Sequence, residues 1–468
     1  MSKKLVAILA LIIMSYQGFA GSKIKVYFNH PVDTTVATGS KAVYLNNCVA
    51  DTLVAYINRA QYSLDFAVYN YVQGSFANIA TAVNNAYSRG VHVRWIYDSS
   101  SSNTGLSAVN SLINRLGSPT SGTYGIMHNK FVVIDAYSPN PADAIVWTGS
   151  TNFTDNQIGT TDYNNVVIIQ DSALAHAYTD EFNMMWGSST LVPNLTLSKF
   201  GPHKTDIGRH NFTIDGHHVE LYFSPSDGTN AKIQNTINTA NTDMYFGMYA
   251  FTDNTDANMI VTKFYAGVYV AGIDDSYGNS YTPRTTFTSG LGASNFLIYS
   301  GLGLYHNKFL IVDPSDECSD PTVLTGSHNW SVSADTKNDE NTLIIHNDTT
   351  ANIYYQSFKA NFNFLGGTLT TIHGCPTNVA NIPNSMKGML IYPIPSTGTT
   401  YIDYELLQSA NVSIKVLNLL GQEVVGAGFS AYQEVGSHRV AISGLSVGVY
   451  IVHCMVGSEQ FSTKLIVE

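Results

Sequence analysis

The sequence predicts an α/β protein made of two duplicated halves, followed by a C-terminal all-β sandwich. Three observations lead to this fold class. Strand-like and helix-like segments alternate over most of the 468 residues, their order occurs twice, and short alternating segments replace them near the C-terminus. A chain of this length exceeds one ordinary domain. We therefore expect halves at residues 21–190 and 220–378, a connector at 191–219 and a β-sandwich at 386–468.

Each half is expected to follow the order strand, helix, strand, helix, strand. In the first half these segments are residues 25–28, 53–57, 64–69, 79–87 and 91–98. In the second half they are residues 220–223, 233–237, 244–251, 259–264 and 268–275. The second helix of each half carries apolar residues at helical spacing and ends at a glycine, Gly90 or Gly267, which favours a left-handed cap.

The C-terminal region is expected to form a small β-sandwich, because short alternating stretches are separated there by turn residues. These stretches are residues 390–392, 400–404, 412–417, 423–425, 438–442, 449–455 and 462–467. The region contains no cluster of reactive side chains, so we expect no catalysis in it.

The N-terminus predicts a signal peptide at residues 1–20. Lys3 and Lys4 precede an apolar run at 5–14, and small residues at 18–20 offer a cleavage site. The alternative is a membrane anchor, which this run is too short to provide because the hydrocarbon core is about 30 Å thick. We therefore expect a secreted or cell-surface protein.

Composition and charge limit the class of partner. With 44% hydrophobic and 12% charged residues, the chain is typical of a well-packed globular protein. The formal net charge is −11, and loss of Lys3 and Lys4 would make it −13 (−11 − 2). An acidic surface repels polyanions, which counts against a general nucleic-acid binder while allowing a local basic pocket.

The four cysteines allow a disulfide in an exported protein but do not indicate a disulfide scaffold. Cys318 and Cys375 lie in loop-like sequence and are the favoured pair. Three full pairings remain open, because Cys48 and Cys454 are also present.

Four histidines gather in or beside the connector, at positions 203, 210, 217 and 218. They lack the i, i+4 spacing of dependable metal sites, so we interpret them as solvated loop residues. No metal and no cofactor are expected.

One motif carries the chemistry and occurs once in each half. The first copy places His128, Lys130 and Asp135 at fixed spacing, followed by Ser150 and Asn152 in a Gly-Ser-Thr-Asn segment. The second copy consists of His306, Lys308, Asp313, Ser327 and Asn329. Two intact copies at equivalent positions of a repeat make a chance match a poor explanation.

The spacing of the motif suits phosphoryl transfer. Residues i and i+2 of a strand share a face, so each histidine projects beside its lysine, and each aspartate falls on the other face as a structural residue. Two ammonium groups and two amides can bind phosphate oxygens. One histidine can attack phosphorus while the other donates a proton. Because each half has one such histidine, the halves must face each other. The alternative of two buried core histidines is disfavoured by the duplicated lysines and asparagines.

This duplicated motif resembles the signature of the phospholipase D superfamily, over about residues 23–374. The resemblance implies paired α/β/α halves with one pseudo-twofold site, no metal, and a phosphohistidine intermediate on His128, with His306 as the acid, although the reverse assignment stays open. The catalytic motif residues would be His128, Lys130, Asp135, Asn152, His306, Lys308, Asp313 and Asn329, supported by Ser150, Ser327 and Glu340. Both motifs lie in one chain, so a monomer suffices for catalysis.

A further position of that family is an acidic residue that orients a histidine. The second half supplies Glu340, whereas the equivalent stretch of the first half has Asn164. One histidine would then have a neutral partner, unless Asp162 substitutes.

The C-terminal region resembles the type IX secretion sorting domain. The matching segments are residues 392–395, 420–422, 444–450 and 464–467. This resemblance implies recognition by the secretion machinery of the outer membrane. An accessory binding sandwich is the alternative.

Three functions are compatible with these features. They are a phospholipase D that hydrolyses phospholipid head groups, a metal-independent endonuclease that cleaves DNA or RNA, and an inactive surface binding protein. Intact motifs disfavour the third. The acidic net charge favours a lipid over a nucleic-acid substrate.

Overall fold

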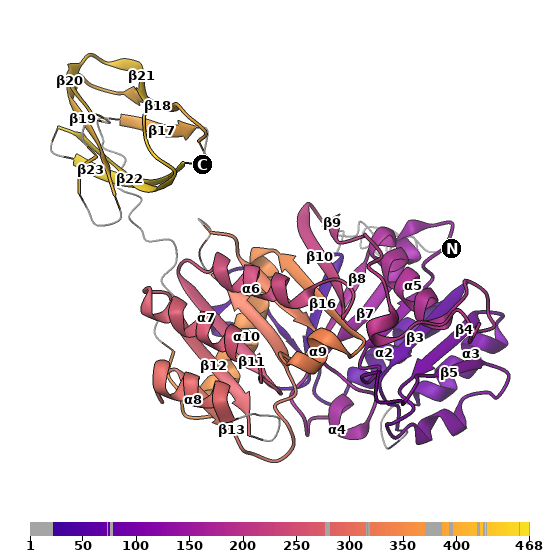
Figure 1. The fold of residues 1–468 in the computed structure, drawn as a ribbon. Helices are drawn as coiled ribbons and strands as arrows, with labels where there is room; N and C mark the ends of the chain where they lie inside the picture. The colour runs from indigo at the N-terminus through magenta and orange to yellow at the C-terminus, as the bar shows by residue number, and fades with distance from the viewer. Residues whose placement is uncertain are drawn as a thin grey trace, which may run out of the picture. The chain divides into compact units, whose positions relative to one another are not determined.

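A computed structural model gives the fold of the chain. It describes residues 22–72, 74, 78–276, 281–314, 316, 319–369, 386–392, 396–418, 422–424, 426, 428–457 and 459–467. The expected signal peptide and the favoured cysteine pair, Cys318 with Cys375, lie outside these residues. The chain forms two compact units, a large one at Met1–His373 and a small one at Gly374–Glu468 (Figure 1).

The first half of the large unit is a sheet of eight strands in the order β2-β1-β8-β7-β6-β3-β4-β5. The strands are β1 Ile24–Phe28, β2 Val43–Tyr44, β3 Ser63–Val68, β4 His92–Tyr97, β5 Asn114–Gly117, β6 Lys130–Ile134, β7 Ile145–Gly149 and β8 Asn165–Gln170. The helices are α2 Val49–Arg59, α3 Ile79–Ser88, α4 Asp155–Ile158 and α5 Ser172–Trp186. Helices α2 and α3 pack on one face of the sheet and α5 packs on the other.

The second half repeats this plan in the strand order β13-β12-β11-β14-β15-β16-β10-β9. The strands are β9 Asn211–Ile214, β10 His217–Ser224, β11 Asp243–Met248, β12 Tyr269–Asp275, β13 Phe296–Tyr299, β14 Lys308–Val312, β15 Thr322–Gly326 and β16 Glu340–His346. The helices are α6 Thr229–Thr239, α7 Asn254–Tyr265, α8 Tyr281–Gly290, α9 Val332–Thr336 and α10 Asp348–Phe364. Apart from the edge strands β2 and β9, each strand has its counterpart at the same place in the other sheet. The predicted α/β duplication is therefore confirmed.

The segment expected to be a plain connector contributes to the second sheet. It contains β9 and the first three residues of β10, which pair as an antiparallel hairpin. The histidines at 217 and 218 consequently lie on a strand rather than in a loop. Only the later part of β10 was predicted as a strand, at residues 220–223, because the segment before it is rich in Pro, Gly, His and Asn.

The two halves share a hydrophobic core that contains α5 and α10. The ring of Tyr178 on α5 packs 5.0 Å from Phe131 of its own half and 5.2 Å from Phe223 of the other half. Tyr354 on α10 is the counterpart, and it packs on both halves in the same way, at 5.3–5.4 Å. Helix α5 therefore fastens β6 to β10 of the opposite half, and α10 fastens β14 to β1, which fixes the two motif strands relative to each other.

The small unit is a β-sandwich, as predicted. Its sheets have the strand orders β17-β18-β21 and β20-β19-β22-β23, and side chains of both sheets meet in one core. The strands are β17 Met386–Tyr392, β18 Thr400–Leu406, β19 Ala410–Leu417, β20 Phe429–Gln433, β21 Gly436–Ile442, β22 Gly448–Val456 and β23 Glu459–Val467. The strand expected at 423–425 is not found in its described part: Glu423 forms an isolated bridge with Leu417, Val425 lies outside the described residues, and the fourth strand is β20.

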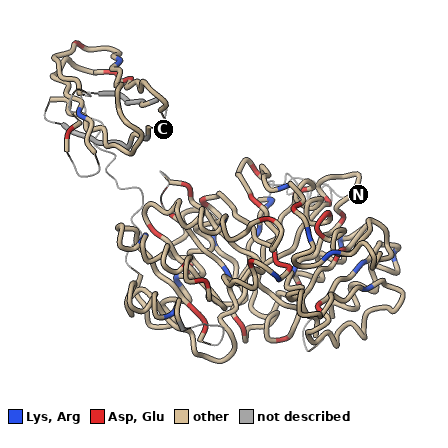
Figure 2. Tube along the Cα trace, in the orientation of Figure 1, with Lys and Arg blue, Asp and Glu red and all other residues tan. Residues whose placement is uncertain are grey.

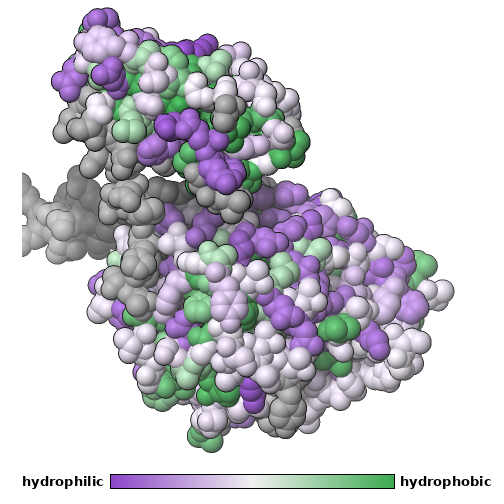
Figure 3. Space-filling model, turned by 60° about the vertical axis from the view of Figure 1, so that its left-hand side comes forward, coloured by the Kyte–Doolittle hydropathy of each residue, from purple (hydrophilic) through white to green (hydrophobic). Residues whose placement is uncertain are grey.

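Polar and neutral residues cover most of the face of the molecule that Figure 3 shows. On the face shown in Figure 3, hydrophobic residues form small separate spots among polar and neutral ones. Among the described helices, none has both the length and the hydrophobicity needed to cross a bilayer.

Candidate active site

The two motif copies meet where the halves meet. Strands β6 and β14 begin at Lys130 and Lys308, and their histidines stand two residues earlier. The amide of Asn341 donates to the side-chain oxygen of Asn129 over 3.1 Å. Asn165 makes the equivalent bond to Asn307 over 3.0 Å. These paired amides hold each motif segment against the opposite half, so the predicted facing arrangement exists.

Each catalytic-motif histidine is oriented by a residue of the other half. Nδ1 of His128 lies 2.8 Å from a carboxylate oxygen of Glu340. Nδ1 of His306 lies 3.0 Å from the side-chain oxygen of Asn164. The motif serines support these partners, because Ser327 donates to Glu340 over 2.7 Å and Ser150 donates to Asn164 over 2.9 Å. The site is thus symmetric in geometry and asymmetric in charge.

The partners determine which ring nitrogen is available. A carboxylate can only accept, so Nδ1 of His128 carries the proton. The amide nitrogen of Asn164 faces the carbonyl groups of Gln157 and Asp162, which leaves its oxygen to accept from Nδ1 of His306. In both rings Nε2 is therefore the nitrogen left for chemistry.

Burial controls the charge of the histidines. Loss of hydration, opposed by Glu340, lowers the pKa of His128 to about 4. Burial and the neighbouring Lys308 and Lys130 hold the pKa of His306 well below its usual range. Both rings are neutral at pH 7 before substrate binds, which is the state that a nucleophile requires.

The two lysines are also buried. Lys130 donates to the carbonyl oxygen of His128 over 2.6 Å, and Lys308 donates to that of His306 over 2.8 Å. An ammonium group has three donors, so others remain for a phosphate. Burial lowers the pKa of Lys130 to about 7. Burial and the proximity of Lys130 hold the pKa of Lys308 well below its ordinary value.

We predict that a phosphate analogue binds with proton uptake. An anion between Lys130 and Lys308 stabilises their charged forms and so raises the pKa of both amines. At any pH between the pKa of the free protein and that of the complex, each amine therefore takes up a proton on binding. At pH 7.5, tungstate binding measured by titration calorimetry should show uptake in buffers of different ionisation enthalpy. Lys130→Met should reduce the uptake, and Lys415→Met in the small unit is the control. Proton release on binding would contradict this prediction.

The remaining motif residues lie where the sequence places them. Asn152 and Asn329 follow β7 and β15, and the side-chain oxygen of each is buried without a hydrogen-bond partner in the described chain. Unsatisfied buried polar atoms are rare in folded proteins, and they suit a site that is completed by a ligand. Gly149 and Gly326, at φ 143° and 150°, precede the motif serines. An added Cβ would stand 2.3 Å and 2.2 Å from backbone oxygens, so these turns require glycine.

The motif aspartates lie at the far ends of their strands. Asp135 follows β6, roughly 20 Å from His128 for an extended strand of this length. Its carboxylate accepts the backbone N–H groups of residues 61–63 over 2.7–2.9 Å. Asp313 accepts those of residues 241–243 in the same way. These contacts agree with the structural role inferred from strand alternation and give no contact with a reacting phosphate.

Replacement of Asp135 by asparagine should therefore reduce stability rather than chemistry. One backbone N–H would then face the NH₂ group of the asparagine, and the other bonds would no longer be charge-assisted. The free energy of unfolding should fall by about 1–3 kcal/mol as a result. Urea unfolding measures this cost. The turnover per folded molecule should stay within a few-fold of wild type, and a loss as large as that of the motif histidines would show a catalytic role instead.

A second pair of buried aspartates supports the motif segments and was not predicted from the sequence. Asp98 accepts the N–H of Met127 over 2.7 Å, and Asp275 accepts that of Tyr305 over 2.6 Å. Each follows or ends the strand after the second helix of its half and holds the residue before the motif histidine. Their equivalent positions in the repeat are a signal that could have revealed them.

A buried ion cluster joins the connector to the site. Lys204 lies between Glu181 on α5 of the first half and Asp339 of the second half, whose side chain is 3.1 Å away. It also donates to the carbonyl oxygen of Ser224 over 2.7 Å. Asp339 precedes Glu340, and its carbonyl oxygen accepts the N–H of His128 over 2.9 Å. Lys204 thus contacts both halves and the segment that orients His128.

Two duplicated α/β/α halves, which share one pair of His-Lys motifs at their junction, define a protein of the phospholipase D type. The family model described as "Cardiolipin synthase, PLD-like domain" matches residues 53–186 and 233–362. The chain belongs to this family, whose members act on phosphodiesters as hydrolases or transferases. Residues 390–468 match the secretion system C-terminal sorting domain, which indicates export to the surface or the medium.

Relatives agree with this assignment. The mitochondrial cardiolipin hydrolase of Drosophila melanogaster is 31% identical over 29% of this chain and 57% of its own length. A phospholipase D of Rickettsia prowazekii (strain Madrid E) is 26% identical over 30% of this chain and 65% of its own. The chain thus spans less than two thirds of either protein. The solved structure of Nuc from Salmonella typhimurium, a phospholipase D family member, is 26% identical, covers 31% of this chain and 93% of its own, and has a TM-score of 0.27.

Proposed function

We propose that this protein is a secreted phospholipase D that hydrolyses phospholipid head groups through a phosphohistidine on His128. The observation that carries the choice of nucleophile is the carboxylate of Glu340 on Nδ1 of His128, against the neutral amide of Asn164 on His306. Phosphorylation of Nε2 makes the ring cationic while Nδ1 keeps its proton. A carboxylate stabilises that cation, whereas an amide does so much less.

The reaction balances with these residues. Nε2 of His128 attacks phosphorus as the bond to the head-group oxygen breaks, and that oxygen takes a proton from Nε2 of His306. The substrate anion between the two rings raises the pKa of His306 so that it is protonated in the complex. In the second step His306 takes a proton from water, the hydroxide attacks phosphorus, and the bond to His128 breaks. The products are phosphatidic acid and the head-group alcohol, and the two lysines hold the non-bridging oxygens throughout.

Two tyrosines support a cationic head group. Tyr69 and Tyr249 are half-buried, and the centre of each ring lies 4.9 Å from the motif histidine of its half. The ammonium groups of Lys130 and Lys308 already lie over these rings, 5.3 Å and 5.0 Å from their centres, so a quaternary ammonium group would bind the opposite faces by cation–π attraction. Tyr71 and Phe251, each two residues further along the chain, are buried in the helix-side cores instead.

The distribution of charge favours lipid over nucleic acid. In Figure 2 the basic residues of the described chain are dispersed among acidic ones rather than gathered in a stripe. The formal net charge of −11 acts in the same direction. Long polyanions are usually bound through clustered Lys and Arg, so nucleic acid is the less favoured substrate class and endonuclease activity the less favoured function.

The deciding experiment offers phosphatidylcholine vesicles and plasmid DNA in parallel, with and without EDTA. Choline release by the wild-type protein, lost in His128→Asn and His306→Asn and retained in His92→Asn at an exposed strand position, would support the lipid proposal. DNA cleavage with the same pattern of variants would make the protein a nuclease instead. Absence of both activities, or their loss in EDTA, would contradict the proposal.

Export is proposed to use the signal peptide at residues 1–20 and then the outer-membrane secretion machinery, which would recognise the small unit. The match of residues 390–468 to the sorting domain supports this route. Because both histidines belong to one chain, catalysis is proposed to need no second copy.

A further inference from the structure

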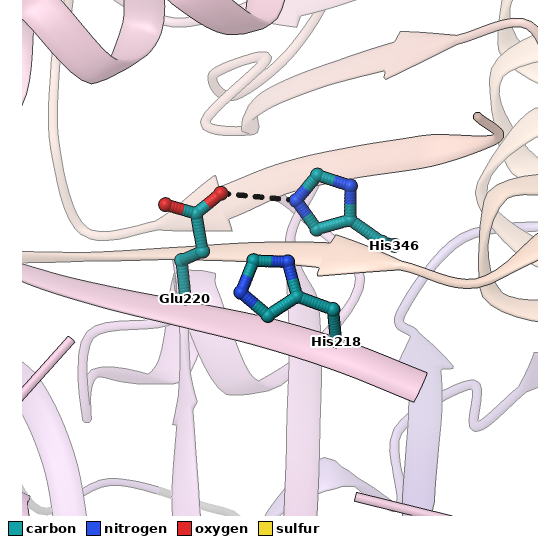
Figure 4. Close-up of side chains that lie close together, drawn as sticks. All are labelled: His218, Glu220 and His346. Atoms are coloured by element: carbon teal, nitrogen blue, oxygen red, sulfur yellow. Dashed lines mark hydrogen bonds and ion pairs between the residues drawn. The ribbon is translucent and has the colours of Figure 1, made fainter. Parts of the chain in front are cut away.

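A second cluster of functional side chains lies at the opposite end of β16 from the active site. His218 and Glu220 are two residues apart on β10, and His346 is directly opposite His218 on β16. Side chains at i and i+2 share a face of a strand, and directly paired residues are neighbours across it. The backbone register therefore brings two imidazoles and a carboxylate together on one face of the sheet, as Figure 4 shows.

The three residues can offer one ligand atom each, and these atoms lie within 4.8 Å of one another. A tetrahedral zinc ion with bonds of about 2.0–2.2 Å holds its ligands roughly 3.3–3.6 Å apart. Small side-chain rotations would close the difference. His218 is exposed, while Glu220 and His346 are half-buried, so the rings have room to move and an ion can enter.

The hydrogen bonds around the cluster orient both rings, and a metal ion would replace the proton that Nε2 of His346 shares with Glu220. Nδ1 of His346 lies 2.7 Å from Asp320, while its Nε2 faces Glu220 over 3.0 Å. A carboxylate that accepts the other N–H of a histidine is the usual support for a metal ligand. Nε2 of His218 lies 3.0 Å from the side-chain oxygen of Asn211, so its Nδ1 keeps a lone pair. That nitrogen has no hydrogen-bond partner among the described residues.

We propose that His218, Glu220 and His346 bind a divalent transition-metal ion such as Zn²⁺, with Asp320 positioning His346. Two imidazoles and one carboxylate are ligands that zinc and its neighbours prefer. The site is separate from the phosphodiesterase centre, because β16 places Glu340 at one end and His346 at the other, about 20 Å apart. The ion would fasten β10 to β16 near the sheet edge, so its expected effect is on stability.

A second three-residue cluster, Asp206, His210 and Asp227, does not offer this arrangement. It has one imidazole where the first cluster has two, and that ring, like that of His346, already faces acceptors at both nitrogens, the carbonyl oxygen of Leu221 at 2.9 Å and Asp206 at 2.8 Å. Asp227 accepts the N–H of Phe223 over 2.8 Å. This second cluster provides a matched control next to β9 and β10.

The test titrates Zn²⁺ into the chelator-stripped full chain by calorimetry. We expect one ion per chain and a higher melting temperature when it is bound. His218→Ala and His346→Gln should each remove this binding, and Asp320→Asn should weaken it about 10- to 100-fold. His210→Gln should bind as wild type does. Circular dichroism establishes that each variant is folded, and the exposed position of His218 makes its variant the decisive one.

Several results would overturn the proposal. They are the absence of stoichiometric Zn²⁺ binding, unchanged binding in folded His218→Ala, and loss of binding in His210→Gln alone. None depends on phosphodiesterase activity.

Discussion

The variant His128→Asn should lose at least about 10⁴-fold in turnover of phosphodiester substrates while keeping its fold. Asparagine cannot form the covalent phosphoryl bond, and the remaining groups can only bind and polarise the substrate. Because the imidazole is buried and paired with Glu340, its removal also leaves that carboxylate without its partner. Steady-state rates of choline release, normalised to folded protein, measure the loss.

The companion variant His306→Asn separates the two roles. It keeps the proposed nucleophile and loses the acid, so a substrate whose leaving group needs no proton should still react once. With bis(p-nitrophenyl) phosphate we expect one equivalent of nitrophenol and a chain whose mass has increased by the remaining phosphoryl ester. If the burst is instead found in His128→Asn and is absent in His306→Asn, the nucleophile is His306.

Lys204→Met should destabilise the large unit by about 3–5 kcal/mol. The change leaves the carboxylates of Glu181 and Asp339 buried without their cation. Burial, opposed by Lys204, already raises the pKa of Glu181 to about 7, so this group depends strongly on its partner. Urea unfolding monitored by tryptophan fluorescence measures the difference.

A matched control is Lys359→Met, because Lys359 pairs with Asp33 over 3.3 Å at a partly exposed position. Such pairs contribute about 1 kcal/mol or less. Adding Glu181→Gln to Lys204→Met should recover part of the loss, since one buried charge is then removed. Equal destabilisation by the two lysine variants would contradict a special role for the cluster.

Much of this architecture could be predicted because the same order of elements occurs twice in the sequence. The strands, helices and glycine caps of one half corroborate those of the other, and Gly90 and Gly267 do have positive φ values of 92° and 97°. The same repetition singled out both His-Lys pairs. The left-handed caps and the motif spacing are local properties, which a sequence records directly.

Other features depend on contacts between distant segments. Nothing near Lys204 in the sequence indicates that it would be buried against Glu181 and Asp339. The partner of each motif histidine also comes from the other half, so the family resemblance indicated Glu340 as an orienting residue without saying which ring it contacts. The hairpin of β9 and β10 was not predicted because backbone pairing between the two strands forms it, and their residue composition does not indicate it.

The exchange of orienting residues between the halves has a consequence for biogenesis. A chain whose first half has folded alone has His128 and Lys130 but lacks Glu340, and it has no second histidine. Such an intermediate cannot complete a turnover, however well its own sheet is formed. An enzyme built in this way is inert until β16, which carries Glu340, has joined the second sheet, so the phosphodiesters that it meets while it is being synthesised are spared.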